Sequence, residues 1–422
     1  MTNGNFDNTM LDGALVSRLR ADLDGLFTVS TVEVPRQLPP AVAMSLLGVN
    51  RRSRKGGSGS VPQGTVIFFF VLLNKDSEKA YDEIAERWLA HDYTPILRRY
   101  KGQIGLIAQP GVVVPQPTNP WINFWLAIIT ILSVLLTGAS YECQCFPTTV
   151  GDWLGGMPMM LTMMVILMAH EFGHYFAARY HKVAVTLPYF IPLPVISPVG
   201  TLGAFIQLRS PFRTKRELFD IGIAGPLGGL IFAFPLIFWG ISGSTVSQIE
   251  RGPGLVLEGN SIFYLLVKYL VHGQLLPNFE AYDTIPYWQE FSRLLIGVIP
   301  AGSGVDVTIN SVAFAAWFGL FVTAMNLLPV GQLDGGHVIY CLLGERARTL
   351  GMILIGLMVL AGIFLWPGWL LWAGLTFFII GPYHPPPLND LVELDPMRKS
   401  LAYLMIFLFV ILFMPNPLQQ FL

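Results

Sequence analysis

Charged residues are scarce in this sequence. Asp, Glu, Lys and Arg make up only 13% of its 422 residues, whereas soluble domains carry about 25%. Hydrophobic residues make up 53% of the chain, and several apolar runs approach the roughly 20 residues needed to cross a hydrocarbon core about 30 Å thick. The formal net charge of -1 offers no general attraction for nucleic acid. The composition predicts a polytopic protein of the lipid bilayer with no nucleic-acid partner.

Cysteine is rare as well, with three residues in all. Cys143 and Cys145 lie close together in ECQC between two apolar runs, and Cys341 stands alone. This spacing is not one of the usual zinc patterns. We expect ordinary loop thiols, with a redox or metal role for the pair as the alternative. The stretch MTNGNFDNTMLDG lacks the basic start and apolar core of a secretory signal, and it is too acidic for a typical transit peptide.

Residues 1–115 have the pattern of a small soluble α/β domain. Helical spacing and runs of β-branched or apolar residues alternate in an order that predicts an antiparallel sheet with helices. FFFVLL is short and ends at Asn74 and Lys75, so we expect a buried strand and not a span. Residues 1–12 are predicted to be disordered. RRSRKGGSGS, residues 51–60, is predicted to be a flexible basic linker, either a solvated loop or a contact with anionic lipid headgroups.

Residues 116–422 are predicted to form the membrane-embedded domain. The expected fold is mainly α, a polytopic helical bundle of about seven spans that includes a re-entrant β-hairpin-like segment. Prolines within a candidate span do not exclude a helix, because neighbouring helices can satisfy the freed backbone groups. The candidate spans are residues 121–138, 157–180, 218–241, 309–328, 350–366, 368–381 and 401–414.

Lys and Arg near the span ends predict the orientation, because cytoplasmic loops carry an excess of these residues. The loop of residues 139–156 has none. One alternating assignment fits the whole pattern, with the N-terminal domain in the cytoplasm and the C-terminus outside. It places residues 170–174 and residues 326–337 towards the same, cytoplasmic side. The basic residues that carry this assignment are Arg98, Arg99, Lys101, Arg209, Arg213, Lys215, Arg216, Arg346, Arg348, Arg398 and Lys399.

Three ionisable side chains interrupt one of the most apolar runs, in ILMAHEFGHYF at residues 166–176. Residues four apart project from the same face of a helix, so His170 and His174 can direct ring nitrogens at one ion, with Glu171 at the edge of that face. Imidazoles are common zinc ligands, and a carboxylate beside such a metal can act as general base towards water. At about 1.5 Å per residue, His170 lies roughly 13 Å from Arg179, so the site is predicted below the membrane surface.

The alternative is a polar pair between helices or a proton relay. Against it, each ionisable group at the centre of a span costs about 2.5–3.5 kcal/mol or more, and the residues have the full metal-binding spacing. The sequence therefore favours a metal site.

A hydrolytic zinc site usually takes three protein ligands and one water. AMNLLPVGQLDGGH, residues 324–337, supplies Asp334 at a similar predicted depth. Pro329 and the neighbouring glycines break the helix and allow the chain to present a side chain to another element. Spacing alone favours Asp334 only modestly over His337, because either side chain can bind zinc.

These motifs resemble the site-2 protease family, the M50-like intramembrane zinc metalloproteases. The resemblance consists of HEFGH in a membrane helix and a later N-x-x-P-x-x-x-L-D-G-G motif, from Asn326 to Gly336. AGPLGG, residues 224–229, is similar to the small-residue motif of the family's third core helix. The match covers roughly residues 120–345. The long soluble N-terminal domain, NLLPVGQLDGG and the tail HPPPLNDLVELDP resemble the EGY-like branch of plants and cyanobacteria.

The resemblance implies one Zn²⁺ per chain, held by His170, His174 and Asp334. It implies regulated intramembrane proteolysis of a single-span transmembrane protein. Some members of the EGY-like branch lack the zinc motif and are taken to be inactive, but this chain retains it.

The segment 183–208 is apolar and rich in proline, which is unlike a helix. We expect a membrane-dipping hairpin whose second half, residues 201–208, offers an open edge to an extended substrate. The family resemblance implies the same; the alternative is an interfacial loop that covers the core. In the expected mechanism Glu171 is the general base and later returns a proton to the leaving amine. Asn326 is either a hydrogen-bond donor to substrate or oxyanion, or a helix-terminal residue.

Two other classes of function remain open from the sequence. One is a transporter that uses the His/Glu cluster as a proton or metal relay, and the other is a non-catalytic membrane scaffold. The protein is expected in a cell membrane, or in a thylakoid or plastid membrane if it comes from a photosynthetic lineage. The oligomeric state cannot be predicted.

Overall fold

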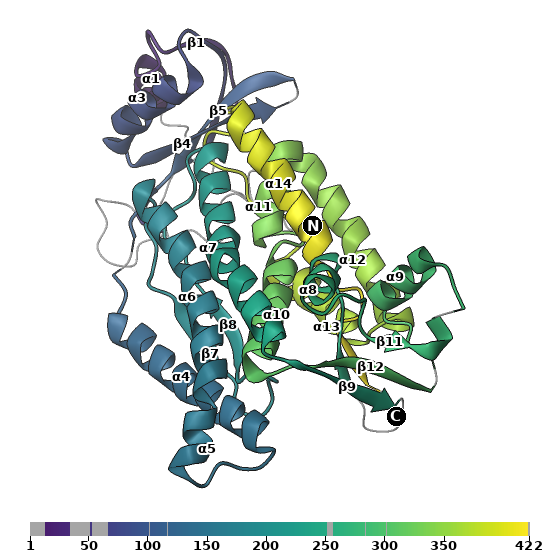
Figure 1. The fold of residues 1–422 in the computed structure, drawn as a ribbon. Coiled ribbons are helices and arrows are strands. Elements are labelled where there is room, and N and C mark those ends of the chain that lie inside the picture. The colour runs from purple at the N-terminus through teal and green to yellow at the C-terminus, as the bar shows by residue number, and fades with distance from the viewer. Residues whose placement is uncertain are drawn as a thin grey trace, which may run out of the picture. The chain divides into compact units, whose positions relative to one another are not determined.

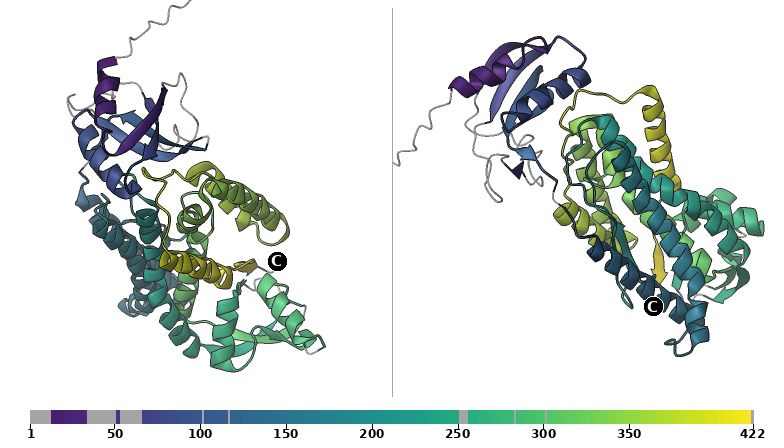
Figure 2. Two further views of the ribbon diagram at one scale, coloured as in Figure 1. Left: turned by 90° about the horizontal axis from the view of Figure 1, so that it is seen from above. Right: turned by 90° about the vertical axis from the view of Figure 1, so that its left-hand side faces the viewer.

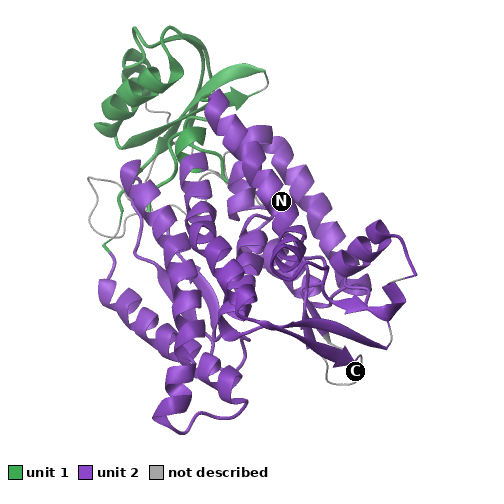
Figure 3. Ribbon diagram, viewed as in Figure 1, with its two compact units in different colours: residues 1–117, 208–218, 385–394 green, residues 118–207, 219–384, 395–422 purple. Residues whose placement is uncertain are grey.

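The computed structural model describes residues 13–33, 51–52, 66–100, 102–115, 117–250, 256–282, 284–300 and 302–420. The chain divides into two compact units (Figure 3). Unit 1 contains residues 1–117, 208–218 and 385–394, and unit 2 contains residues 118–207, 219–384 and 395–422.

The order of elements along the chain is shown in Figure 1. The helices are α1 (Gly13–Ala21), α3 (Ser77–Leu89), α4 (Pro120–Cys143), α5 (Val150–Gly155), α6 (Met157–Tyr180), α7 (Lys215–Ser242), α8 (Ile262–His272), α9 (Tyr287–Ile296), α10 (Ser311–Asn326), α11 (Asp334–Leu343), α12 (Ala347–Phe364), α13 (Gly368–Gly374) and α14 (Pro396–Leu412). Shorter helical turns are η1 (Glu280–Tyr282), η2 (Gly344–Arg346) and η3 (Leu375–Ile380). The strands are β1 (Phe27–Glu33), β2 (Arg51–Arg52), β3 (Ile67–Leu73), β4 (Tyr93–Tyr100), β5 (Gln103–Pro110), β6 (Val112–Val113), β7 (Tyr189–Pro192), β8 (Thr201–Phe205), β9 (Thr245–Glu250), β10 (Val256–Glu258), β11 (Asn278–Phe279), β12 (Ser303–Thr308) and β13 (Leu418–Gln420).

Unit 1 is built on a four-stranded antiparallel sheet of order β1-β3-β5-β4. The apolar run predicted as a buried strand is β3, whose first five residues are buried. Helix α3 begins after Asp76, whose carboxylate accepts backbone N–H groups of the first turn; such a cap satisfies donors that a helix start leaves unpaired. Trp88 of α3 is fully buried and donates its indole N–H to the Leu19 carbonyl at 3.2 Å. Trp88 also belongs to a buried cluster that includes Phe69 and Leu106 of the sheet, so the sheet, α1 and α3 share one core.

Two segments far along the chain complete the open edge of β4. The Leu97 N–H donates to the Leu388 carbonyl at 2.7 Å, and the Asp390 N–H donates to the Leu97 carbonyl at 2.9 Å. Asn389 in turn donates its backbone N–H to the carbonyl of Arg213 at 2.7 Å. Residues 208–218 and 385–394 thus extend the sheet, which protects an edge that would otherwise be open to aggregation.

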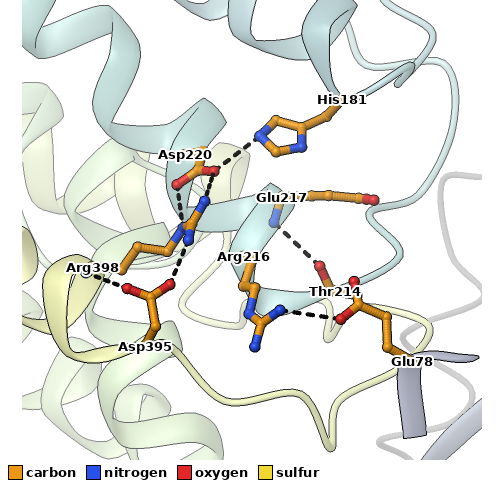
Figure 4. Close-up of polar contacts among 8 residues, drawn as sticks. All are labelled: Glu78, His181, Thr214, Arg216, Glu217, Asp220, Asp395 and Arg398. Carbon is orange, nitrogen blue, oxygen red and sulfur yellow. Dashed lines mark hydrogen bonds and ion pairs between the residues drawn. The ribbon is translucent and has the colours of Figure 1, made fainter. Parts of the chain in front are cut away.

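Ion pairs within unit 1 attach the segment of residues 208–218 to α3. Arg213 pairs with Asp82, and Arg216 Nη1 lies 3.1 Å from Glu78 Oε2 (Figure 4). These side chains are largely exposed, so each pair contributes about 0–1 kcal/mol. The backbone hydrogen bonds to β4 and the packing of Leu388 and Leu391 on the core therefore account for most of the attachment.

Two predictions for unit 1 fall largely outside the described residues. Residues 1–12 are not described, and of the predicted linker at 51–60 only Arg51 and Arg52 are, as the short strand β2 paired with β6. The predicted boundary between residues 115 and 116 stays a prediction.

Unit 2 is mainly helical, and four of its helical segments are long and apolar enough to cross a membrane among the described residues. They are Pro120–Cys143, Val150–Tyr180, Lys215–Ser242 and Asp334–Phe364. The prediction of about seven spans is not confirmed, because its remaining candidates fall on shorter helices. Helix α10, for example, has 16 residues, about 24 Å, which is less than a hydrocarbon core.

Helix α10 is the most enclosed of these short helices. Most of its residues are buried, and it packs against α6, α4 and α14. Helix α14, yellow in Figures 1 and 2, also packs against α11. These helices form the surroundings of the centre described below.

The predicted hairpin is present as the antiparallel pair β7–β8. Strand β7 lies beside α4 and β8 contacts α6. The pairing register shifts so that Pro192 faces Thr201 and Ile191 faces Gly203, which leaves Leu202 without a partner in β7. The sheet has two strands only, so the outer edge of β8 is not covered by another strand of the described chain.

Cys143 and Cys145 are bonded as a disulfide at the end of α4. The expectation of ordinary free thiols is therefore wrong for this pair. Cys341 is a free, buried cysteine in α11.

The segment between α7 and α10 contains a buried ion cluster that no residue pattern in the sequence predicted. The apolar segment YLLVKYLVHG, residues 264–273, lies mostly in α8. Its Lys268 is fully buried, with Nζ 3.0 Å from Glu258 and 3.2 Å from Asp306. Tyr264 donates its hydroxyl to Glu258 at 2.9 Å. Burial raises the pKa of the Asp306 carboxyl to about 6, although Lys268 opposes the shift.

We predict that Lys268→Met destabilises the protein by about 3–5 kcal/mol, because two buried carboxylates lose their cation. Thermal unfolding of detergent-solubilised protein measures the change. Lys79→Met, which removes an exposed lysine, is the matched control and should melt like the wild type. A normal melting temperature for Lys268→Met would contradict the burial of an ion cluster here.

The raised pKa of Asp306 predicts a pH dependence of stability. A carboxyl whose pKa is higher in the folded than in the unfolded state stabilises the fold below its ordinary pKa, and this contribution is lost as the pH rises through the folded value. For Asp306 the window runs from 3.8 to about 6. The difference in melting temperature between wild type and Asp306→Asn should therefore change across this window and be constant above it.

Candidate metal centre

Helix α6 places three ionisable side chains in the interior of unit 2. His170, Glu171 and His174 are all buried, with exposed fractions of 5%, 4% and 7%. The one-turn spacing brings the two rings together, with Nε2 of His174 3.2 Å from Nε2 of His170. Both histidines therefore present the same type of nitrogen to a common point, as the H-E-x-x-H spacing predicts.

Asp334 comes from a different helix and completes this group. It is the first residue of α11, and its carboxylate oxygens lie 3.3 Å from His170 Nε2 and 3.4 Å from His174 Nε2. The three ligand atoms all lie within 4.8 Å of one another. Two imidazole nitrogens and one carboxylate oxygen form a donor set suited to zinc, with a position left for water.

A glycine-rich turn brings Asp334 to this point. Helix α10 ends at Asn326, and Gly331 has φ of 55°, in the region that favours glycine. A Cβ on Gly335 would clash with the backbone of Leu327 and Leu328. The turn therefore folds tightly against the end of α10, which explains the need for glycine in LDGG.

The hydrogen bond of His174 sets its tautomer for metal binding. Its Nδ1 donates to the Ile221 carbonyl of α7 at 2.7 Å. The proton is then on Nδ1, and the lone pair of Nε2 is directed at His170 and Asp334, as in metal-bound histidines with a backbone partner. The residues present therefore fit a zinc ion.

His337, the competing third ligand, lies outside this group. Its Nδ1 is 2.6 Å from Nε2 of His384, and Tyr340 stacks on the His384 ring. Asp334, and not His337, is brought together with the two histidines.

Asn326 and Glu171 lie at the edges of the group. The Asn326 Nδ2 is 3.3 Å from His170 Nε2, so the side chain is within reach of the centre. The backbone of Ile206, one residue past β8, hydrogen-bonds to the Glu171 carboxylate. The end of the hairpin therefore touches the residue predicted to be the general base.

The small residues of AGPLGG allow α7 to approach α6. A Cβ on Gly225 would overlap the His174 ring, and a Cβ on Gly229 would lie 3.4 Å from the His170 Cβ. The motif was recognisable in the sequence only by resemblance, and no residue pattern pointed to Ile221 or Ile206, which act through backbone atoms. The spacing of Gly225 and Gly229 is the feature of the sequence that indicates a close approach of α7 to α6.

We predict that Gly225→Ala lowers zinc affinity at least about tenfold, because the new methyl group must displace His174. It should also cost about 1–3 kcal/mol of stability through overpacking. Chelator competition and thermal unfolding measure the two effects. Gly356→Ala, where a Cβ meets nothing within 4 Å, is the matched control; equal zinc affinity in both variants would contradict this packing.

Comparisons with known proteins agree with the geometry. Residues 158–363 match the family model "Peptidase family M50". The chain is 27% identical over 326 residues to "Probable zinc metalloprotease EGY1, chloroplastic" of Oryza sativa subsp. japonica, covering 71% of this chain and 52% of the relative. It is 28% identical over 333 residues to the EGY1 protein of Arabidopsis thaliana, covering 71% and 54%.

A protein named "Probable zinc metalloprotease EGY2, chloroplastic" of Oryza sativa subsp. indica is 26% identical over 294 residues, covering 64% of this chain and 49% of the relative. The chain spans about half the length of the curated relatives it matches. The matched region contains HEFGH, AGPLGG and LDGG, which the fold places around one centre. Residues 158–363 therefore match peptidase family M50, and the chain is similar to proteins named EGY zinc metalloproteases.

Proposed function

We propose that this chain is an intramembrane zinc metalloprotease that hydrolyses peptide bonds within or near transmembrane segments of membrane proteins. The observation that carries the proposal is the convergence of His170, His174 and Asp334 on one point, beside Glu171 and among apolar helices. The names of the relatives, zinc metalloproteases, support the same chemistry.

His170, His174 and Asp334 would hold the zinc ion. When bound, zinc supplies a Lewis acid that activates water and polarises the scissile carbonyl. Glu171 follows His170 directly, so its carboxylate lies beside the ligands and can take a proton from the attacking water. The same carboxyl then passes that proton to the leaving amine, which balances the hydrolysis.

Asn326 is proposed to donate a hydrogen bond to the substrate carbonyl or the developing oxyanion. Its Nδ2 approaches His170 Nε2, a proposed ligand atom, which places an amide donor at the edge of the reaction site. Such donors stabilise charge that develops in the transition state.

The proposed substrate is a single-span membrane protein that must be unwound before it is cut, because a helix engages its carbonyls internally. The outer edge of β8 can pair with an extended substrate strand. Because the Ile206 backbone contacts Glu171, a strand added to β8 would run towards the general base. We further propose that the hairpin dips into the bilayer.

We place the active site towards the cytoplasmic side, or its stromal equivalent, from the distribution of Lys and Arg. The relatives named above are chloroplastic, which favours a plastid or thylakoid membrane over a cell membrane for this chain. With about seven spans, the proposed orientation has the N-terminal domain in the cytoplasm and the C-terminus outside.

The test is cleavage of tagged single-span proteins by detergent-purified, zinc-loaded protein. We expect cleavage that 1,10-phenanthroline abolishes and added zinc restores. No cleavage of any member of a panel with helix-breaking residues in its spans would overturn the proposal.

The role of β8 is tested by the unpartnered Leu202, whose side chain is 63% exposed. Leu202→Pro removes one edge N–H, and Leu202→Ala removes only the side chain. We expect the proline variant to lose about fivefold to tenfold in kcat/KM relative to the alanine variant, the value of one hydrogen bond. Equal rates would exclude pairing at that edge position.

A further inference from the structure

A three-helix ion cluster lies near the start of α7. Asp220 of α7 accepts two hydrogen bonds from Arg398 of α14, from Nε to Oδ1 at 2.7 Å and from Nη2 to Oδ2 at 2.6 Å (Figure 4). His181, the C-cap residue that follows α6, places its Nε2 3.0 Å from Asp220 Oδ2. One carboxylate therefore joins the helix of the H-E-x-x-H motif to α7 and α14.

The guanidinium of Arg398 is held from two sides. Besides Asp220, it pairs with Asp395, the N-cap of α14, whose carboxylate also accepts the Arg398 backbone N–H at 3.0 Å. The side chains of Asp220 and Arg398 are 22% and 30% exposed, so the pair is shielded from much of the solvent. Bidentate guanidinium–carboxylate pairs fix orientation as well as distance.

A basic residue at the end of a span can simply anchor the membrane topology. Such an anchor needs no fixed partner. Arg398 instead has two carboxylate partners in fixed geometry, and one of them, Asp220, connects it to α7, which is distant in sequence. The arrangement therefore indicates that Arg398 fixes the position of α14 relative to α7.

The cluster is one residue away from the group that orients a proposed zinc ligand. Ile221, which follows Asp220 in α7, accepts the Nδ1–H of His174 at 2.7 Å. Next, Gly222 packs on His337, since a Cβ there would lie 2.9 Å from the His337 Cβ. One turn further, Gly225 leaves room only for the His174 ring. An α-helix rises about 1.5 Å per residue along its axis. A slide of α7 by even one residue would therefore move the Ile221 carbonyl out of hydrogen-bond reach of His174.

We infer that Asp220 and Arg398 are positioning residues of the metal centre. Their bidentate pair, with His181, fixes α7 against α6 so that the Ile221 carbonyl holds His174 in its metal-binding orientation. The inference rests on the proposed zinc site. Partners that orient a ligand from outside the ligand set typically change metal affinity 10–100-fold when they are lost.

The experiment measures zinc dissociation constants of detergent-purified full-length protein by chelator competition. For Arg398→Met and for Asp220→Asn we expect about tenfold weaker zinc binding. Arg398→Lys should lie between these variants and the wild type, because one ammonium cannot make both bonds. Arg348→Met removes an exposed arginine at the start of another apolar helix and should bind zinc like the wild type.

Two further measurements separate positioning from simple stabilisation. The double variant Asp220→Asn/Arg398→Met should bind zinc no more weakly than either single variant, since both remove the same pair. At saturating zinc the variants should regain most of the wild-type kcat. Lower melting temperatures with zinc affinities within twofold of the wild type would overturn the inference and leave a structural brace. Failure of the wild type itself to bind zinc would refute the proposed function instead.

Discussion

Glu171→Gln should reduce the rate of substrate cleavage by about 10²–10⁴-fold, the range that a positioned general base contributes. The amide keeps the size of the side chain but cannot accept the proton from the attacking water. His170, His174 and Asp334 are untouched, so the zinc content should stay near one per chain. Single-turnover cleavage of a tagged single-span protein, with zinc analysis of the same sample, measures both quantities.

The control for this variant is Glu345→Gln, which changes an exposed carboxylate in η2 and should cleave at the wild-type rate. Full activity of Glu171→Gln would show that another group is the base. Loss of zinc together with activity would show that Glu171 acts in the metal site and not as a base.

Asp334→Ala should lose both zinc and cleavage. Its two oxygens are the only contributions of α11 to the described ligand group. Without them a metal would keep two imidazole ligands, too few for a stable catalytic site. Metal analysis after purification should fall from about one zinc per chain to near none, even when zinc is resupplied.

His337→Ala is the discriminating comparison, because this histidine was the other candidate ligand. Its ring pairs with His384 in the structure, so the variant should retain zinc. If His337→Ala lost zinc and Asp334→Ala retained it, the proposed ligand set would be overturned. A wild type without zinc that transports protons or metal in vesicles would favour the relay interpretation.

The sequence predicted the proximity of the two histidines, because that signal is local. His170 and His174 meet because residues four apart share a helix face, and no other part of the chain is needed to see this. The strand β3 could also be distinguished from a span, because its apolar run is too short to cross a bilayer. AGPLGG was identified only by resemblance, and resemblance strengthened the modest preference for Asp334, since both depend on contacts between helices that are distant in sequence.

The sequence by itself therefore determined the membrane character, the two histidines, the adjacent carboxylate and the helix break before Asp334. Only the tertiary structure shows that Asp334 lies beside His170 and His174 while His337 lies beside His384, because this depends on how α11 packs against α6. The tertiary structure also revealed the buried ion pairs of Lys268 and the hydrogen bond from His174 to the Ile221 carbonyl. A buried charge and a backbone carbonyl leave no mark in a residue pattern, since any lysine can be exposed and every residue has a carbonyl. Which lysine is buried beside carboxylates, and which carbonyl accepts a side-chain hydrogen bond, depends on how whole helices pack.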